Sequence, residues 1–206
     1  MIFKTKAEFE AAMIAALQNK GWENHVLKYP TEEDLLKNWA DILFENNRGI
    51  DRLDDAPLTD TEMQQILEQV MALRTPLKLN GFINGKTVSI TRDNPDDPLH
   101  LGKEVSLKIY DRREIAAGQS RYQIAQQPKF KSKSKILGDR RGDLMLLING
   151  MPVFHVELKK SGIPVSQAYH QIEKNSDEGI FTGIFSLVQI FVAMQPEETV
   201  YFANPG

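Results

Sequence analysis

The chain has 206 residues, of which 41% are hydrophobic and 26% charged, proportions typical of a globular protein that buries a core without disulfide or metal staples. It contains no cysteine, which excludes disulfides and thiolate zinc sites and suits a reducing cytoplasm. The formal net charge of −3 gives no overall attraction for nucleic acid, so any such role must depend on a local basic patch. No apolar run is long enough to span a bilayer and no secretory signal pattern is present, so we expect no membrane partner.

Amphipathic helices are predicted first in chain order, and they form a helical N-terminal part over residues 1–76. The first helix begins after Thr5, which with Glu8 makes a capping-box pattern. A second helix follows, and a third begins after Thr59 with the same pattern and is expected to end before Pro76. In each, apolar residues recur at helical spacing.

Strand patterns dominate residues 77–206. One strand is expected after an Asn84-Gly85 turn, and a helix is expected after Pro164. Asn149-Gly150 separates LMLLI from VFHVELK, which is a strong signal for a β-hairpin. Further strands are expected at about residues 103–110, 121–126, 186–194 and 199–203. The whole pattern predicts an α/β fold with a central sheet flanked by helices.

Charged side chains lie at the ends of this hairpin, although its strands are otherwise apolar. Glu157 and Lys159 share one face of their strand, because alternate side chains of a strand point the same way. The hairpin brings Asp143 back beside Glu157, and two converging carboxylates suit Mg²⁺, with a lysine beside them to act on a water. Charged strand ends are also common in solvent-exposed sheets, so spacing alone leaves both interpretations open.

The register of the hairpin gives a stricter condition. A regular two-residue turn at Asn149-Gly150 places Asp143 opposite Val156, and therefore on the other face from Glu157. The acids converge only if the strands slip by one residue. Pro152 cannot donate to the ladder, so we predict a slip there.

The motif of Asp143 followed by Glu157-Leu158-Lys159 resembles the signature of the PD-(D/E)xK nuclease superfamily. A longer segment resembles the amino-terminal domain of the restriction (R) subunit of type I restriction-modification enzymes. It has the sequence RGDLMLLINGMPVFHVELK, and QAYHQI follows it. Softer matches extend over most of the chain, including NNRGIDRL and the closing YFANPG. The resemblance implies one restriction-endonuclease-like domain over residues 1–206, with a catalytic core at 77–206, in a fragment of a longer chain.

The same resemblance implies roles for individual residues. Asp143 and Glu157 would bind Mg²⁺, and Lys159 would position water or stabilise the transition state. Glu10 matches a first-helix glutamate that approaches the metal in related nucleases, although Lys6 stands where the family has an earlier acid in that helix. Gln171 matches a glutamine of the following helix, although Asn175 stands where the family has tyrosine. Gly142 stands directly before Asp143, at the position of the proline that gives the PD-(D/E)xK superfamily the first letter of its name.

Alternating lysines form the best local basic patch, since an extended conformation would array them on one side. With the two neighbouring arginines, the candidates for contacts with DNA phosphates are Lys129, Lys131, Lys133, Lys135, Arg140 and Arg141. Lysine runs are equally common in solvated loops, so this interpretation also has an alternative.

The function implied is a type I site-specific deoxyribonuclease that cleaves double-stranded DNA with Mg²⁺ in the cytoplasm. The partners implied are the methylation and specificity subunits. No GxxxxGK[ST] loop occurs, so ATP hydrolysis would belong to motor domains outside this sequence. The alternatives are a non-catalytic DNA-binding or subunit-docking module of the same fold, which Asn175 favours, and a stand-alone repair nuclease.

Overall fold

A computed structural model describes residues 2–49, 51–73, 76–83, 87–109, 120–131 and 139–204. Their contacts form two compact units, one of Met1–Glu33 with Arg121–Asn204 and one that includes Asp34–Ser120. The expectation of a single domain that changes character at residue 76 stays a prediction. The first unit joins the N-terminal helix to the sheet that follows much later in the chain.

A six-stranded sheet forms the centre of the first unit, in the order β1-β4-β7-β8-β9-β10. Its strands are β1 (Val26–Lys28), β4 (Tyr122–Gln126), β7 (Leu144–Ile148), β8 (Met151–Leu158), β9 (Ile190–Gln195) and β10 (Glu198–Ala203). The pairs β1–β4 and β8–β9 are parallel and the other pairs are antiparallel. This mixed sheet flanked by helices confirms the predicted α/β fold and is compatible with a restriction-endonuclease-like fold.

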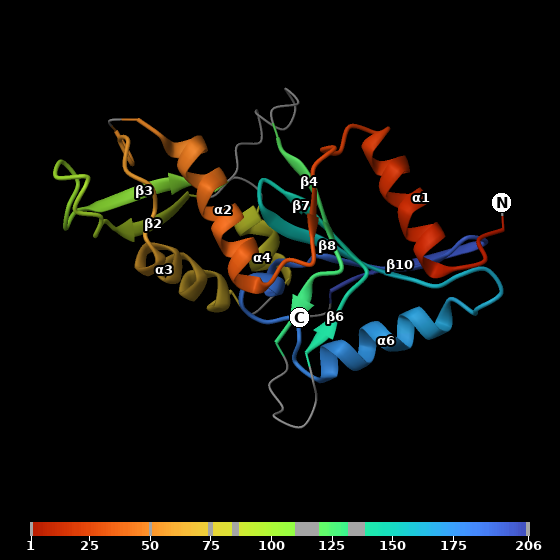
Figure 1. Ribbon diagram of the computed structural model, residues 1–206. Helices are drawn as coiled ribbons and strands as arrows, with labels where there is room; N and C mark the ends of the chain where they lie inside the picture. The colour runs from red at the N-terminus through yellow and green to blue at the C-terminus, as the bar shows by residue number, and fades with distance from the viewer. Residues whose placement is uncertain are drawn as a thin grey trace. The chain divides into compact units, whose positions relative to one another are not determined.

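The two faces of this sheet are covered by different helices (Figure 1). Helix α1 (Lys6–Gln18) packs Phe9 against Leu144 and Val156 on one face. On the other face, Tyr169 of α6 (Ser166–Asp177) stacks edge-on against Phe202 of β10 at 5.1 Å between ring centroids. The short 3-10 helix η1 (Gly183–Leu187) leads into β9. Side chains that alternate along β8 therefore enter different environments.

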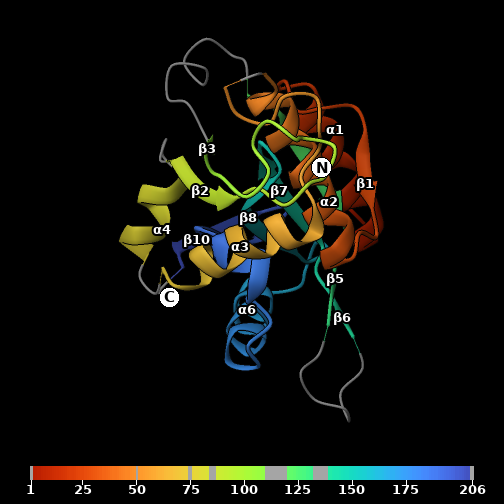
Figure 2. The same cartoon turned by 90° about the vertical axis from the view of Figure 1, so that its left-hand side faces the viewer.

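Two short strands form a narrow ribbon beside the main sheet, visible in Figure 2. They are β5 (Lys129–Phe130) and β6 (Arg140–Arg141), and Lys129 pairs with Arg141. Phe130 anchors the ribbon, because its fully buried ring lies 4.8 Å from the ring of Phe185.

The second unit contains helices and a separate two-stranded sheet. Its elements are α2 (Glu32–Asn47, whose first turn begins in the other unit), α3 (Asp60–Met71), α4 (Pro76–Ile83), β2 (Thr87–Thr91) and β3 (Glu104–Lys108). The two predicted capping boxes are confirmed at the starts of α1 and α3. None of the helices in the described ranges is long and apolar enough to cross a membrane.

A buried ion cluster holds the second unit together around Arg92. Its guanidinium donates to Glu62 at 2.5 Å and to Asp97 at 2.9 Å, and all three side chains have no exposed surface. The same group also donates to the carbonyls of Leu53, Ala56 and Pro57. Burial is tolerated because each charge has a partner and the guanidinium is saturated with acceptors.

Among the features of the fold that were not predicted, three concern α3, α4 and β1. Helix α3 ends at Met71, ahead of the expected limit, and α4 follows from Pro76, where burial of Leu79 and Phe82 stabilises a helix. Proline is well suited to the first position of a helix, since that position has no intrahelical partner for an N–H. The third feature is β1, whose partner β4 lies far along the chain. The expected Asn84-Gly85 turn lies outside the described residues.

Candidate active site

The β7–β8 hairpin has the irregular register that the chemistry requires. Asn149 and Gly150 have φ of 49° and 82°, which is the left-handed pair expected of a two-residue hairpin turn. Ile148 then pairs with Met151 and Leu147 with Pro152, but Leu146 pairs with Phe154. Val153 is therefore the extra residue of a β-bulge. The predicted slip at Pro152 is confirmed, and it lies directly after that proline.

The bulge brings the two predicted carboxylates to the same position on the hairpin. Beyond it, Leu144 pairs with Val156, so continuing the register by one residue sets Asp143 opposite Glu157. The Asp143 residue is 5% exposed and Glu157 is fully buried. Asp143 Oδ2 also accepts a hydrogen bond from the Leu158 backbone N–H at 2.7 Å, which fixes it to the end of β8.

The two carboxyl groups have opposite pKa shifts. Burial, and next the charge of Glu157, raises the pKa of Asp143 from 3.8 to about 7. Burial also opposes ionisation of Glu157, but its hydrogen bond with His155 and the nearby charges lower its pKa below the ordinary value. Burial and mutual repulsion therefore oppose the simultaneous ionisation of the two carboxyl groups, and the Lys6 ammonium partly offsets this for Asp143.

His155 supports Glu157 from the same face of β8. Its Nε2 lies 3.1 Å from Glu157 Oε1, and its buried ring lies between the rings of Phe130 and Phe181. An ionised Glu157 makes Nε2–H the donor of this hydrogen bond. His155 is fully buried, and its Nδ1 has no hydrogen-bond partner, so the imidazole is only half satisfied.

The close approach of His155 explains the glycine at position 142. A Cβ on Gly142 would lie 2.7 Å from His155 Cε1 and 3.0 Å from a ring carbon of Phe130. The Gly142 N–H also donates to the Pro128 carbonyl at 3.0 Å. A proline here would both clash and lose that hydrogen bond, so this chain requires glycine where the superfamily name has proline.

Lys159 is held by the helix that follows the hairpin. Its Nζ donates to Gln171 Oε1 on α6 at 2.7 Å, and its backbone N–H donates to Met194 O on β9 at 2.9 Å. The structure thus brings Gln171 to Lys159. Asn175, one turn further along α6, is buried.

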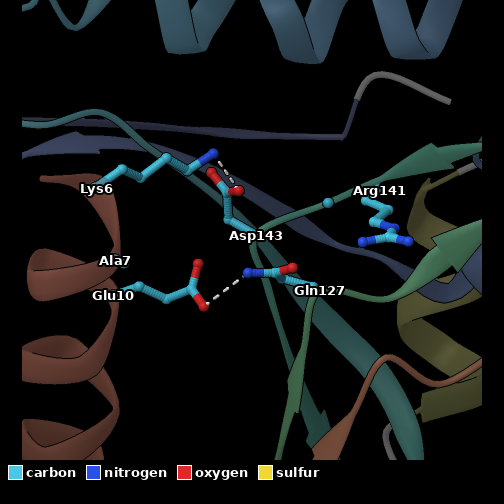
Figure 3. A pocket seen from close by; sticks show the side chains of 7 residues that line it. Lys6, Ala7, Glu10, Gln127, Arg141 and Asp143 are labelled. Carbon is cyan, nitrogen blue, oxygen red and sulfur yellow. Dashed lines mark hydrogen bonds and ion pairs between the residues drawn. The ribbon is translucent and has the colours of Figure 1, made fainter.

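A pocket of about 360 Å³ opens at the Asp143 end of the hairpin, lined by Lys6, Ala7, Glu10, Gln127, Arg141, Gly142 and Asp143. Figure 3 shows Lys6 and Glu10 projecting from α1 into it, one helical turn apart. Lys6 Nζ forms an ion pair with Asp143 Oδ1. Glu10 Oε1 accepts from the side-chain amides of Gln126 and Gln127, the latter at 3.2 Å.

Lys6 and Gln127 were not identified from the sequence as parts of this site. The available signal for Lys6 was its position four residues before Glu10, which places both on one face of the helix. Gln127 carried no comparable signal, because its role depends on the end of β4 meeting α1.

The predicted basic patch is only partly assembled. Lys131 is paired with Glu33 at 2.6 Å, and Arg140 is paired with Glu178 at 2.6 Å. Lys129 lies opposite Arg141 in the ribbon, and the Arg141 guanidinium lies 5.9 Å from the centroid of the Tyr29 ring. Lys133 and Lys135 lie outside the described residues.

The donor set suits a hard cation, although it is small. Within the described ranges no group of three or more His, Asp or Glu side chains is arranged to hold a metal ion. However, Glu157 Oε2 is buried without a hydrogen-bond partner, beside a second carboxylate whose ionisation is opposed. An unsatisfied carboxylate oxygen in such a pair fits Mg²⁺, which prefers oxygen ligands and keeps several waters.

The pKa of Asp143 has a consequence for stability. Because the folded chain holds a proton on Asp143 that the unfolded chain releases, stability of the metal-free protein should fall as pH rises from about 4 to 7. We expect Asp143→Asn to exceed the wild type in free energy of unfolding at pH 8 by on the order of 2 kcal/mol, and by far less at pH 5. Urea unfolding at both pH values with a chelator measures this, and an equal difference at both would contradict it.

Comparison with known proteins extends these observations to almost the whole sequence. Residues 5–206 match the family model for the type I restriction enzyme R protein N terminus. Among similar proteins, the type I restriction enzyme SsaAORF53P endonuclease subunit of Staphylococcus saprophyticus is 29% identical over 204 residues. The SauMSSORF170P endonuclease subunit of Staphylococcus aureus is 29% identical over 208 residues.

These two relatives are much longer than the chain. The match covers 99% of the chain but 20% of each relative, so the chain spans about a fifth of their length. A third relative, the type I restriction enzyme EcoprrI endonuclease subunit of Escherichia coli, is 25% identical over 209 residues, which cover 98% of the chain and 59% of the relative.

Proposed function

Because the chain belongs to the family of type I restriction enzyme R protein N termini, we propose that it is the endonuclease domain of such a subunit. It would hydrolyse phosphodiester bonds of double-stranded DNA in a Mg²⁺-dependent reaction. The observation that supports this best is the convergence of Asp143 and Glu157 at the bulged hairpin, with Lys159 held one residue beyond Leu158. Nearly buried carboxylates placed together at the edge of a pocket are costly unless a cation or a reaction uses them.

Asp143 and Glu157 would hold the metal in this proposal. Bound there, Mg²⁺ would supply charge stabilisation for the phosphoryl oxygens and a more acidic water. His155 holds Oε1 of Glu157 at 3.1 Å and leaves Oε2 without a protein partner. The Leu158 N–H orients Asp143 at 2.7 Å. Both carboxylates are therefore placed by the scaffold before any ligand arrives.

Lys159 supplies the positive charge that acts on the reacting group. The water oxygen would attack phosphorus in line as the bond to the 3′ oxygen breaks, and negative charge would develop on the phosphoryl oxygens. The attacking water would release a proton to solvent, and the leaving 3′ oxygen would take one up from solvent to become a hydroxyl. Gln171 Oε1 accepts one of the three Nζ protons of Lys159, which leaves two protons to donate to the water or to a phosphoryl oxygen. Gln171 is accordingly a positioning residue.

The DNA would approach along the β5–β6 ribbon and the pocket beside it. Arg141 is the basic residue best placed for a phosphate, since it is exposed and lines the same pocket as Asp143. Lys131 and Arg140 would first have to leave Glu33 and Glu178. Methylation and specificity subunits, and ATP-driven motor domains, would belong to the complete enzyme; the cytoplasmic location also remains a prediction.

Metal titration of the chain tests the proposal against a non-catalytic module of the same fold. Titration calorimetry with Mn²⁺ should detect a site that Asp143→Asn and Glu157→Gln each weaken by at least about tenfold, because each removes a charged ligand. Glu178→Gln, on the same unit but paired with Arg140, is the matched control and should leave the affinity unchanged. If no Mn²⁺ binding is detected, or if neither substitution changes the Mn²⁺ affinity, the result would favour the non-catalytic module.

A further inference from the structure

The ion pair between Lys6 and Asp143 is the feature of the site that the proposed reaction does not use. Lys6 is the first residue of α1, where the partial positive charge of the helix N-terminus disfavours a cation. Its neighbour Glu8 has the opposite sign and caps the same turn. The position of Lys6 is therefore not explained by the helix, but it is explained by its partner.

The two side chains differ in their freedom to move. The Asp143 side chain is 7% exposed and is tied to the Leu158 N–H, whereas the Lys6 side chain is 40% exposed at the mouth of the pocket. Lysine also has a flexible stem and a strongly hydrated ammonium. The ammonium can therefore leave Asp143 for solvent while the carboxylate stays in place.

The geometry points to Lys6 as a built-in counter-ion that competes with the divalent cation for Asp143. In the metal-free protein the ammonium neutralises Asp143 beside the buried Glu157. A metal held by these carboxylates would push the ammonium from Oδ1 into the open pocket, because two cations at contact distance from one carboxylate repel each other. This inference rests on the proposed function, because it assumes the same metal site.

The exchange gives the site two states with similar charge. Without the metal, the Lys6 ammonium limits the repulsion between Asp143 and Glu157. With the metal, the cation does so, and Lys6 adds a mobile positive charge at the mouth of the pocket that Glu10 and Arg141 also line. The domain would then bind its metal more weakly than the two acids alone allow.

Substitution of Lys6 shows whether its ammonium competes with the metal for Asp143 or helps the metal to bind. We expect Lys6→Met to bind Mn²⁺ roughly tenfold more tightly than the wild type in titration calorimetry, because the competing charge is gone. Lys6→Arg keeps the charge and should not bind more tightly than the wild type. Lys4→Met, an exposed lysine two residues earlier, is the matched control and should leave the affinity within about twofold.

Thermal unfolding supplies a second readout that a merely structural role would not produce. With a chelator, Lys6→Met should melt below the wild type, since Asp143 loses its counter-ion. With saturating Mn²⁺ its gain in Tm should exceed that of the wild type. An unchanged or weaker Mn²⁺ affinity in Lys6→Met would overturn the inference.

The controls distinguish this failure from failure of the proposed function. If the wild type binds Mn²⁺ through Asp143 and Glu157 but Lys6→Met does not bind it more tightly, only the role of Lys6 is wrong. If neither protein binds Mn²⁺, or if Asp143→Asn leaves the Mn²⁺ affinity unchanged, the metal site itself is wrong and both proposals fail.

Discussion

Under the proposed function, replacing Lys159 with methionine in a complete restriction enzyme that contains this domain is expected to lower the rate of DNA cleavage by roughly 10³-fold or more, while ATP hydrolysis by its motor domains continues. Methionine keeps the length and apolar stem of lysine but removes the protons that Nζ donates, one of which goes to Gln171 at 2.7 Å. The loss should appear in kcat rather than in affinity for DNA, because the charge is required where the phosphoryl oxygens become more negative.

The adjacent lysine provides the control for this experiment. Lys160 carries the same charge on the next residue but is exposed beyond the end of β8. Lys160→Met should cleave at close to the wild-type rate, so a difference between the two variants measures position rather than net charge. Full cleavage by Lys159→Met, measured on supercoiled plasmid with ATP present, would remove Lys159 from the mechanism.

Arg92→Met is expected to cost on the order of 3–5 kcal/mol in the free energy of unfolding, the largest effect on stability that we anticipate. The substitution leaves Glu62 and Asp97 as buried carboxylates without their cation, in side chains that have no exposed surface. It also leaves the backbone carbonyl of Ala56 without its donor, whereas those of Leu53 and Pro57 keep the Ala56 N–H and the Asn94 side-chain amide. A buried charge that has lost its partner is far more costly than an exposed one.

Arg48 offers a matched comparison in the same unit. It pairs with Asp55 at 2.6 Å, but these side chains are 52% and 74% exposed. Arg48→Met should therefore cost far less free energy of unfolding than Arg92→Met, because water screens such a pair and replaces it easily. Urea unfolding of both variants measures the difference. Equal costs for Arg92→Met and Arg48→Met would show that the cluster contributes little.

Local rules account for the parts of the molecule that could be predicted. Asn149-Gly150 adopts positive φ at both positions, and the capping boxes at Thr5 and Thr59 start their helices, because each signal acts over a few residues. The bulge beside Pro152 was predictable for a different reason. A metal site shared by Asp143 and Glu157 needs both on one face, and the period of a strand permits that only with one extra residue.

The parts that were missed depend on contacts between distant segments. β1 has three residues and little pattern of its own, and it exists because β4 offers it a parallel edge. Lys6 reaches Asp143 only once α1 has packed on β7 and β8, and His155 reaches Gly142 only once the bulge has set its direction. The spacing of residues in the sequence does not indicate such contacts, because tertiary packing determines them.

The bulge at Val153 also determines what kind of change the hairpin can tolerate. The placement of Glu157 and Lys159 depends on whether the number of residues between the turn and Glu157 is odd or even, more than on which apolar residues fill the segment. Exchanging one apolar side chain for another on β8 alters packing, whereas deleting one residue there would rotate both charged groups to the opposite face. In this family such strands should vary in composition far more readily than in length.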